Sequence, residues 1–201
     1  MAEEAHTAEA AEMGGMPPML AYTIRAPIQA QAQAGSALIR IGQGPSQQPL
    51  YPSQLKDGSY WIVILDANKP ASKVWETTTQ DNTTVPDKLD TYMNNPAYLF
   101  AVVTQFLGSG QVPQGPLYDY LAKHGAGREL QKLEQISAYT DVPYGLFGRV
   151  SYILTGQCGT GGQIAYERSS YLEPAVLLMS LMPMPNGQPP YSICDSYTFV
   201  H

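Results

Sequence analysis

The chain has 201 residues and a formal net charge of −6, and charged residues make up 14% of it, against about 25% in an ordinary globular protein. This acidic balance excludes the basic face that nucleic-acid binding requires, so we expect no nucleic-acid partner. No window holds the roughly 20 apolar residues of a membrane span, and residues 1–15 lack the positive start and apolar stretch of a secretory signal. We therefore expect no membrane contact, and a cytoplasmic protein or a component of a particle such as a virion.

The uncharged polar character of the surface leaves two interpretations open. The chain holds 14 Tyr and 8 Met, with 35 Gly and Pro residues together. A β-rich domain with many turns would have this composition. A surface that lies against protein partners would have it too, because interfaces favour Tyr and Met and avoid Lys and Glu.

The first 35 residues are predicted to be an acidic N-terminal arm and a lead-in to the domain. Apolar side chains in this arm could insert into a neighbouring protein as adaptable anchors. Pro17 and Pro18 would keep that part of the arm extended. The predicted anchors are Met13, Met16, Met19 and Leu20.

The rest of the chain, residues 36–201, is predicted to be a single α+β domain with a largely antiparallel sheet sandwich. Strand-like alternation begins at residues 22–44, and Tyr60–Leu65 is apolar on both alternating faces, which is typical of a strand covered on both sides. Helices are expected over 86–94 and 116–136, because apolar residues recur there with helical spacing. Gly125 is expected to lie beyond the end of a first helix in 116–136, and another short helix follows it. Further strands are expected over 73–79, 97–105, 148–157, 163–174, 175–185 and 191–200.

Asp66 is the first candidate for chemistry, because it ends the apolar run of residues 60–65. Together with Asn68 it resembles the nucleophile strand of haloacid-dehalogenase-like phosphatases, with Thr104 as the hydroxyl that contacts phosphate. The chain returns at once as a strand that carries Trp75, however. We therefore expect Asp66 and Asn68 to form the corner of a hairpin and to hydrogen-bond the backbone.

Other candidate sites are also interpreted as structural. The Gly-rich residues 155–162 lack the Lys of a phosphate-binding loop and precede an extended segment, so they are expected to form a turn between strands. Cys158 would need His124 as a base, yet His124 is expected to cap a helix end. Cys158 and Cys194 are expected to be unpaired thiols, and we predict no metal site and no cofactor.

Aromatic side chains remain as candidates for binding a partner or stacking on sugar rings. Buried in the sheet, they would belong to the core, and this is the favoured interpretation for the two tryptophans. The candidates are Trp61, Trp75, Tyr166, Tyr171, Tyr191 and Tyr197.

Four stretches give the middle of the chain a known pattern: residues 57–77, 98–105, 116–136 and 143–156. In this order of hairpin, strand, helical segments and closing strand, residues 57–156 resemble the ILEI-type domain, named for the interleukin-like inducer of epithelial–mesenchymal transition. Residues 157–201 would then form a C-terminal β extension. The resemblance implies a compact α+β sandwich without an established catalytic centre, and a related stem domain of a glycosyltransferase binds sugar.

The chain also departs from that family. The animal proteins are secreted and carry disulfides, whereas this chain has two cysteines and no signal. The family's Asp-Thr-Tyr stretch follows its hairpin directly, but here Asp90, Thr91 and Tyr92 fall on a predicted helix. We predict a non-enzymatic structural or interaction subunit that docks on protein neighbours, with a carbohydrate-binding module and a dehalogenase-like phosphatase as alternatives.

Overall fold

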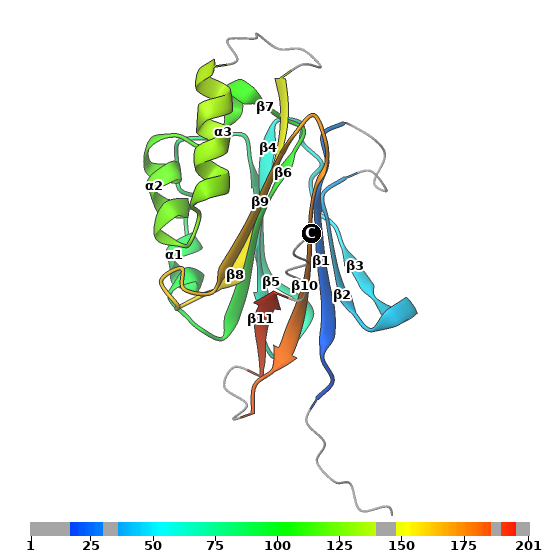
Figure 1. The fold of residues 1–201 in the computed structure, drawn as a ribbon. Helices are drawn as coiled ribbons and strands as arrows, with labels where there is room; N and C mark the ends of the chain where they lie inside the picture. The colour runs from blue at the N-terminus through cyan, green and yellow to red at the C-terminus, as the bar shows by residue number, and fades with distance from the viewer. Residues whose placement is uncertain (1–16, 30–35, 140–147, 186–189, 196–201) are drawn as a thin grey trace, which may run out of the picture.

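Two antiparallel sheets pack face to face, and three helices cover the outer side of one of them (Figure 1). The structure is a computed structural model, and it describes residues 17–29, 36–139, 148–185 and 190–195. This architecture confirms the predicted α+β sandwich with a largely antiparallel sheet and short helices.

The first sheet has five strands in the order β11–β10–β1–β2–β3, and each neighbouring pair is antiparallel. Its strands are β1 (Leu20–Ala26), β2 (Leu38–Gly42), β3 (Gln48–Leu50), β10 (Ala175–Pro183) and β11 (Tyr191–Asp195). β1 lies at the centre of this sheet, between β10 and β2. The folded unit therefore begins before the predicted boundary at residue 36.

The second sheet has six strands and runs in the order β5–β4–β6–β8, with β7 and β9 also paired to β8. Its strands are β4 (Ser59–Asp66), β5 (Lys69–Thr79), β6 (Tyr98–Gln105), β7 (Leu107–Gly108), β8 (Arg149–Gln157) and β9 (Ala165–Tyr171). All the pairs are antiparallel, including the hairpin of β4 and β5 that the sequence predicts.

The helices are α1 (Leu89–Met93), α2 (Gly115–Lys123) and α3 (Arg128–Tyr139). The first is shorter than the predicted 86–94, because Lys88 has a φ of 67° and the regular helix starts only after it. The region 116–136 forms two helices, as predicted, and the chain breaks between them at Gly125, whose φ is 100°. Among the described residues, none of the helices combines the length and apolar character that a membrane crossing requires.

The buried strand β4 explains the long apolar run in the sequence. Trp61, Val63 and Leu65 face the core between the two sheets, whereas Tyr60 and Ile62 face the core beneath the helices. Successive side chains of a strand point to opposite faces, so a strand covered on both sides needs apolar residues at every position. The prediction that this run is covered on both faces is confirmed.

Candidate functional site

Asp66 lies at the corner of the β4–β5 hairpin, as predicted. One carboxylate oxygen of Asp66 accepts a hydrogen bond of 2.8 Å from the Asn68 backbone N–H and one of 2.9 Å from the Asn68 side-chain amide. This is the local backbone bonding by which Asp stabilises a turn. The carboxylate is therefore engaged in holding the hairpin.

The antiparallel sheet separates the groups that phosphatase chemistry would need. In the pairing of β4 with β6, Asp66 lies opposite Tyr98, while Thr104 lies opposite Tyr60. The two positions are six residue steps apart along each strand, which corresponds to about 20 Å. Thr104 is fully buried and bonds the backbone of Tyr152. Asp66 and Thr104 therefore do not meet at one site.

The Gly-rich stretch is a turn between two antiparallel strands, as predicted. β8 ends at Gln157 and β9 begins at Ala165. A strand therefore follows the glycines, in place of the helix whose N-terminus would bind a phosphate. Gly162 instead lies against the chain break after α2. A Cβ added to Gly162 would come within 2.7 Å of the Gly125 backbone nitrogen. The glycine is required here because two backbones approach each other closely.

The two cysteines are free, as predicted, and Cys158 is buried. Burial raises the pKa of the Cys158 thiol to about 12, so the thiol stays protonated at neutral pH. Its sulfur lies 3.8 Å from the sulfur of Met93. Cys194 is half-buried.

His124 follows the last residue of α2 and caps it, as predicted. Its backbone N–H reaches the carbonyl oxygens of Tyr120 and Leu121 at 3.2 and 3.1 Å. Its ring centroid lies 4.5 Å from that of Tyr120, and burial, followed by the charge of Lys123, lowers its pKa. Within the described ranges, no group of three or more His, Cys, Asp or Glu side chains is placed to hold a metal ion.

Most of the predicted aromatic candidates serve the core or its margin. Trp61 is fully buried and Tyr191 is 7% exposed. Trp75 is half-buried and stacks on Tyr92, with ring centroids 5.7 Å apart. Tyr166 is half-buried against the core between the sheets, whereas Tyr171 is 37% exposed. Tyr197 lies outside the described residues.

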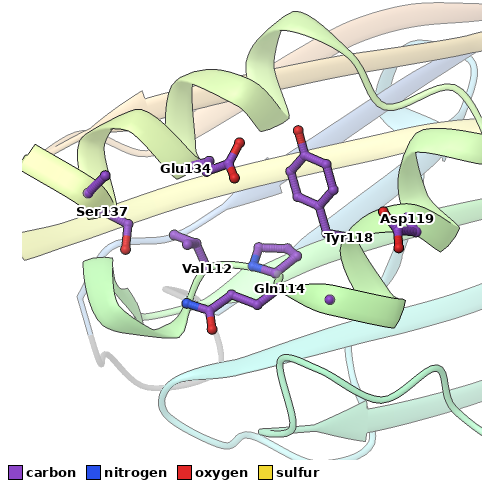
Figure 2. A pocket seen from close by; sticks show the side chains of 9 residues that line it. Val112, Gln114, Tyr118, Asp119, Glu134 and Ser137 are labelled. Atoms are coloured by element: carbon purple, nitrogen blue, oxygen red, sulfur yellow. The ribbon is translucent and has the colours of Figure 1, made fainter.

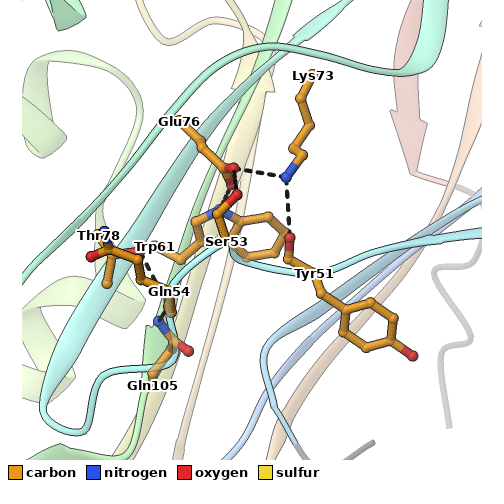
Figure 3. A network of polar contacts seen from close by, with 8 residues as sticks. All are labelled: Tyr51, Ser53, Gln54, Trp61, Lys73, Glu76, Thr78 and Gln105. Carbon is orange, nitrogen blue, oxygen red and sulfur yellow. Dashed lines mark hydrogen bonds and ion pairs between the residues drawn. The ribbon is translucent and has the colours of Figure 1, made fainter. Parts of the chain in front are cut away.

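Trp61 is anchored by a polar network at the edge strand β5 (Figure 3). Its indole N–H donates a hydrogen bond of 2.8 Å to Glu76, which also accepts bonds from Lys73 and Ser53. Partial burial acts to raise the pKa of the Glu76 carboxyl, but these hydrogen bonds outweigh it and hold the pKa below its ordinary value of 4.5. The network is a structural support of the core.

A cleft of about 490 Å³ opens between the start of α2 and the second half of α3 (Figure 2). Tyr118 rises from α2 toward α3, which carries Glu134. Partial burial, and then the negative charge of Glu134, raises the pKa of Tyr118. The cleft thus combines an aromatic ring with several polar groups. Its lining is Val112, Pro113, Gln114, Gly115, Tyr118, Asp119, Glu134, Ser137 and Ala138.

The largest exposed apolar feature of the five-stranded sheet lies on β10. Strand alternation buries Met179 and Leu181 in the core between the sheets and leaves Val176 and Leu178 on the opposite side, 44% and 59% exposed. Met182 follows on the same side, 38% exposed. Two further exposed methionines extend this row, and we call the whole set the β10 strip: Met19, Val176, Leu178, Met182 and Met184.

Part of the predicted docking arm reaches this strip. Leu20 opens β1 opposite Leu181, so continuing the same pairing by one residue sets Met19 opposite Met182. Met19 is 53% exposed. Met13 and Met16 lie outside the described residues.

The β10 strip was not singled out from the sequence, although residues 175–185 carry a signal for it. They are apolar at almost every position, so the strand is apolar on both faces. Such a strand needs a cover on both sides.

No known family model matches the chain, and no curated protein matches it either.

Proposed function

We propose that this protein is a non-catalytic structural subunit of a larger assembly, in which copies of the chain contact one another through the β10 strip. The observation that carries the proposal is Leu178, a leucine in the middle of a regular strand that is 59% exposed. Exposed apolar side chains are ordinary when single, but several of them gathered on one face are typical of an interaction site.

The strip is long enough to act as a docking surface, although Ser180 lies between Leu178 and Met182 on the same face. From Val176 to Met184 it runs about 26 Å along one strand. Its five side chains, between 38% and 59% exposed, offer roughly 500 Å² together, within the range of the largest patches on monomeric proteins. A stable interface takes about 800 Å² from each partner, so the strip would supply the centre of such an interface.

The arrangement of the candidate catalytic groups supports a non-catalytic role. Asp66 is bonded into its turn, Thr104 lies at the other end of the sheet, and Cys158 is a buried, protonated thiol. A catalytic site needs a nucleophile, a base and a group that stabilises developing charge around one point. These residues do not supply such a set.

Replacing Leu178 with aspartate should dissociate the assembly into monomers. A carboxylate at the centre of an apolar contact would lose its hydration without gaining a partner, which should weaken association on the order of a hundredfold. Native mass spectrometry and light scattering of the full chain measure this directly.

Leu55→Asp is the matched control, because Leu55 is 50% exposed and lies in a loop away from the strip. This variant should keep the mass of the wild-type assembly. A wild-type chain that is monomeric at every concentration tested would overturn the proposal, as would an assembly that Leu178→Asp leaves intact.

The cleft between α2 and α3 favours carbohydrate binding as a second function. Sugars are bound by an aromatic ring together with side chains that accept and donate hydrogen bonds to hydroxyl groups. Tyr118 would supply the ring, and Asp119, Glu134 and Gln114 would supply polar groups. Trp75 is less suited, because its ring already stacks on Tyr92.

Replacing Tyr118 with alanine should therefore abolish binding to any glycan that the wild-type protein retains on a glycan array. The expected loss is at least about tenfold in affinity, in line with the removal of one ring contact. Trp75→Ala serves as the comparison and should leave glycan binding unchanged. An array on which the wild-type protein binds no glycan would count against this second function.

The resemblance to ILEI-type domains stays a prediction. It would relate the sugar-binding alternative to the glycosyltransferase stem domain, but no motif allows sugar-contacting residues to be carried over to this chain.

A further inference from the structure

We infer that the junction of α2, α3 and the β8–β9 turn is an acid-sensitive switch, which loosens when His124 takes up a proton. His124 stands between the two helices, directly after Lys123, the last residue of α2. This inference does not depend on the proposed assembly, because the helices cover the outer side of the six-stranded sheet and the β10 strip lies on the five-stranded one (Figure 1). The two features can therefore be tested separately.

The imidazole ring of His124 is buried, and one of its nitrogens has no partner. The residue is 6% exposed, and its Nε2 makes no hydrogen bond with any of the described residues. A neutral ring tolerates such a place far better than a cation does, because burying an unpaired charge costs much more than burying an unpaired neutral group. In the imidazolium both nitrogens carry a proton. A charged His124 would therefore hold a positive charge, and an N–H group without an acceptor, out of contact with water.

The charged groups near His124 do not offset this cost. Burial, followed by the positive charge of Lys123, lowers the pKa of His124, and the carboxylate of Asp90 on α1 acts in the opposite direction. Asp90 is exposed, so solvent weakens its effect, and it already accepts a hydrogen bond of 2.9 Å from the Tyr120 hydroxyl. The carbonyl end of α2 attracts a cation as well, but less strongly than burial disfavours one. Tyr120 and Cys158 stay uncharged, because burial raises the pKa of both groups.

Backbone contacts at the junction convert the charge of His124 into a movement. A Cβ added to Gly162 would lie 3.0 Å from the carbonyl carbon of His124, so the β8–β9 turn lies directly against the end of α2. The backbone N–H of Ala126 donates a hydrogen bond of 3.0 Å to the Leu121 carbonyl oxygen and closes this end of the helix. Such close packing leaves no space for water beside the ring. Hydration of the imidazolium therefore requires the end of α2 to separate from the turn.

The loosening stays local, because the neighbouring attachments do not involve His124. The carboxylate of Glu167, on β9, accepts hydrogen bonds from the first turn of α3 and from Tyr152 on β8. These bonds keep α3 on the sheet while the end of α2 moves. The cleft at Tyr118 lies between the same two helices, so its shape changes with the state of the junction.

The direction of the pKa shift gives the pH range of the switch. In the closed junction the pKa of His124 lies below its ordinary value of 6.5, which the ring regains when the junction opens. The open state therefore binds more protons than the closed state. The closed junction loses stability as the pH falls below about 6.5, and the loss continues down to the pKa of the closed state.

Hydrogen exchange of the full chain at about pH 7.5 and about pH 5.5, corrected for the intrinsic effect of pH, tests the switch. In the wild type, protection of the Gly125 and Ala126 amides should be about fivefold lower at the acidic pH, while the amides of β4 and β6 keep their protection. His124→Phe keeps a ring beside Tyr120 but cannot take up a proton, so its junction should respond less. His6→Phe removes a different histidine and is the matched control, which should respond like the wild type.

The inference is wrong if the junction of the wild type is equally protected at both pH values. It is also wrong if His124→Phe loses as much protection as the wild type, because another group would then be the trigger. Strands that lose protection together with the junction would show that the whole chain unfolds and that no local switch exists. If His124→Phe does not fold, an NMR titration of the His124 ring in the wild type decides: a pKa below 6.5 supports the switch, and a pKa at or above 6.5 overturns it.

Discussion

Replacing Gly125 with alanine should lower the free energy of unfolding by about 3 kcal/mol. Gly125 has a φ of 100°, a conformation that residues with a side chain rarely adopt. A Cβ at this position would lie 2.3 Å from the Cβ of Ala165 and 2.9 Å from the carbonyl oxygen of Gly162. Both neighbours belong to the turn and strand on the other side of the contact, so one of the two backbones must move. Urea denaturation followed by circular dichroism measures the loss.

Gly161→Ala is the matched control for this variant. Gly161 also has a positive φ, 59°, but nothing lies within 4 Å of the place where its Cβ would be. Gly161→Ala should therefore lower the free energy of unfolding by only about 1 kcal/mol, the cost of the backbone conformation. Equal losses in the two variants would show that the close approach of Gly125 to Gly162 contributes nothing to stability.

The contact between Gly125 and Gly162 shows what the sequence could not supply. The Gly-rich residues 155–162 were correctly interpreted as a turn, because the residues after them are extended and a phosphate-binding Lys is missing. The reason for the glycines is different: one of them packs against the break between α2 and α3, more than 30 residues earlier in the chain. A single sequence records the glycine, but not the distant backbone against which it lies.

The strands and their faces could be predicted where the local pattern is strong. β4 is apolar on both faces, and its hairpin with β5 has an Asp corner, so the cover on both sides and the turn were both predicted correctly. β1 was assigned to a lead-in, because its place depends on pairing with β10, about 150 residues later. Such a partner cannot be found from alternation alone.

The same limit applies to the candidate sites. Trp61 and Trp75 sit on neighbouring strands and look alike in the sequence, but only the packing of the second sheet shows that Trp61 is fully buried. The exposed side of β10 depends on which face of the first sheet meets the second. The cleft at Tyr118 depends on how α2 and α3 pack beside each other, and the predicted break between them at Gly125 does not determine that packing.

Glu167 joins three elements of the fold through one carboxylate. It lies on β9 and accepts hydrogen bonds from the backbone N–H groups of Glu129 and Leu130, at 2.7 and 3.2 Å, in the first turn of α3. The hydroxyl of Tyr152, on β8, donates a third bond of 3.0 Å. Ser169, also on β9, makes a second link to α3. Its backbone N–H and its hydroxyl donate hydrogen bonds of 3.0 and 2.6 Å to the Glu129 carboxylate. The first turn of α3 is thus capped by a residue of the sheet instead of by its own N-terminal neighbour.

Replacing Glu167 with alanine should lower the free energy of unfolding by about 3 kcal/mol, because it removes a helix cap and leaves the hydroxyl of the buried Tyr152 without this acceptor. Glu167→Gln keeps one acceptor oxygen but loses the charge that favours a helix N-terminus, so its loss should be about 1 kcal/mol. Glu173→Ala removes an exposed carboxylate and should change the stability by less than about 0.5 kcal/mol. Urea denaturation ranks the three variants, and hydrogen exchange should show faster exchange of the Glu129 and Leu130 amides in Glu167→Ala. If Glu167→Ala were as stable as Glu173→Ala, the carboxylate would be a bystander, and α3 would be attached to the sheet by the bonds from Ser169 to Glu129 and by apolar contacts such as those of Leu130 and Leu133.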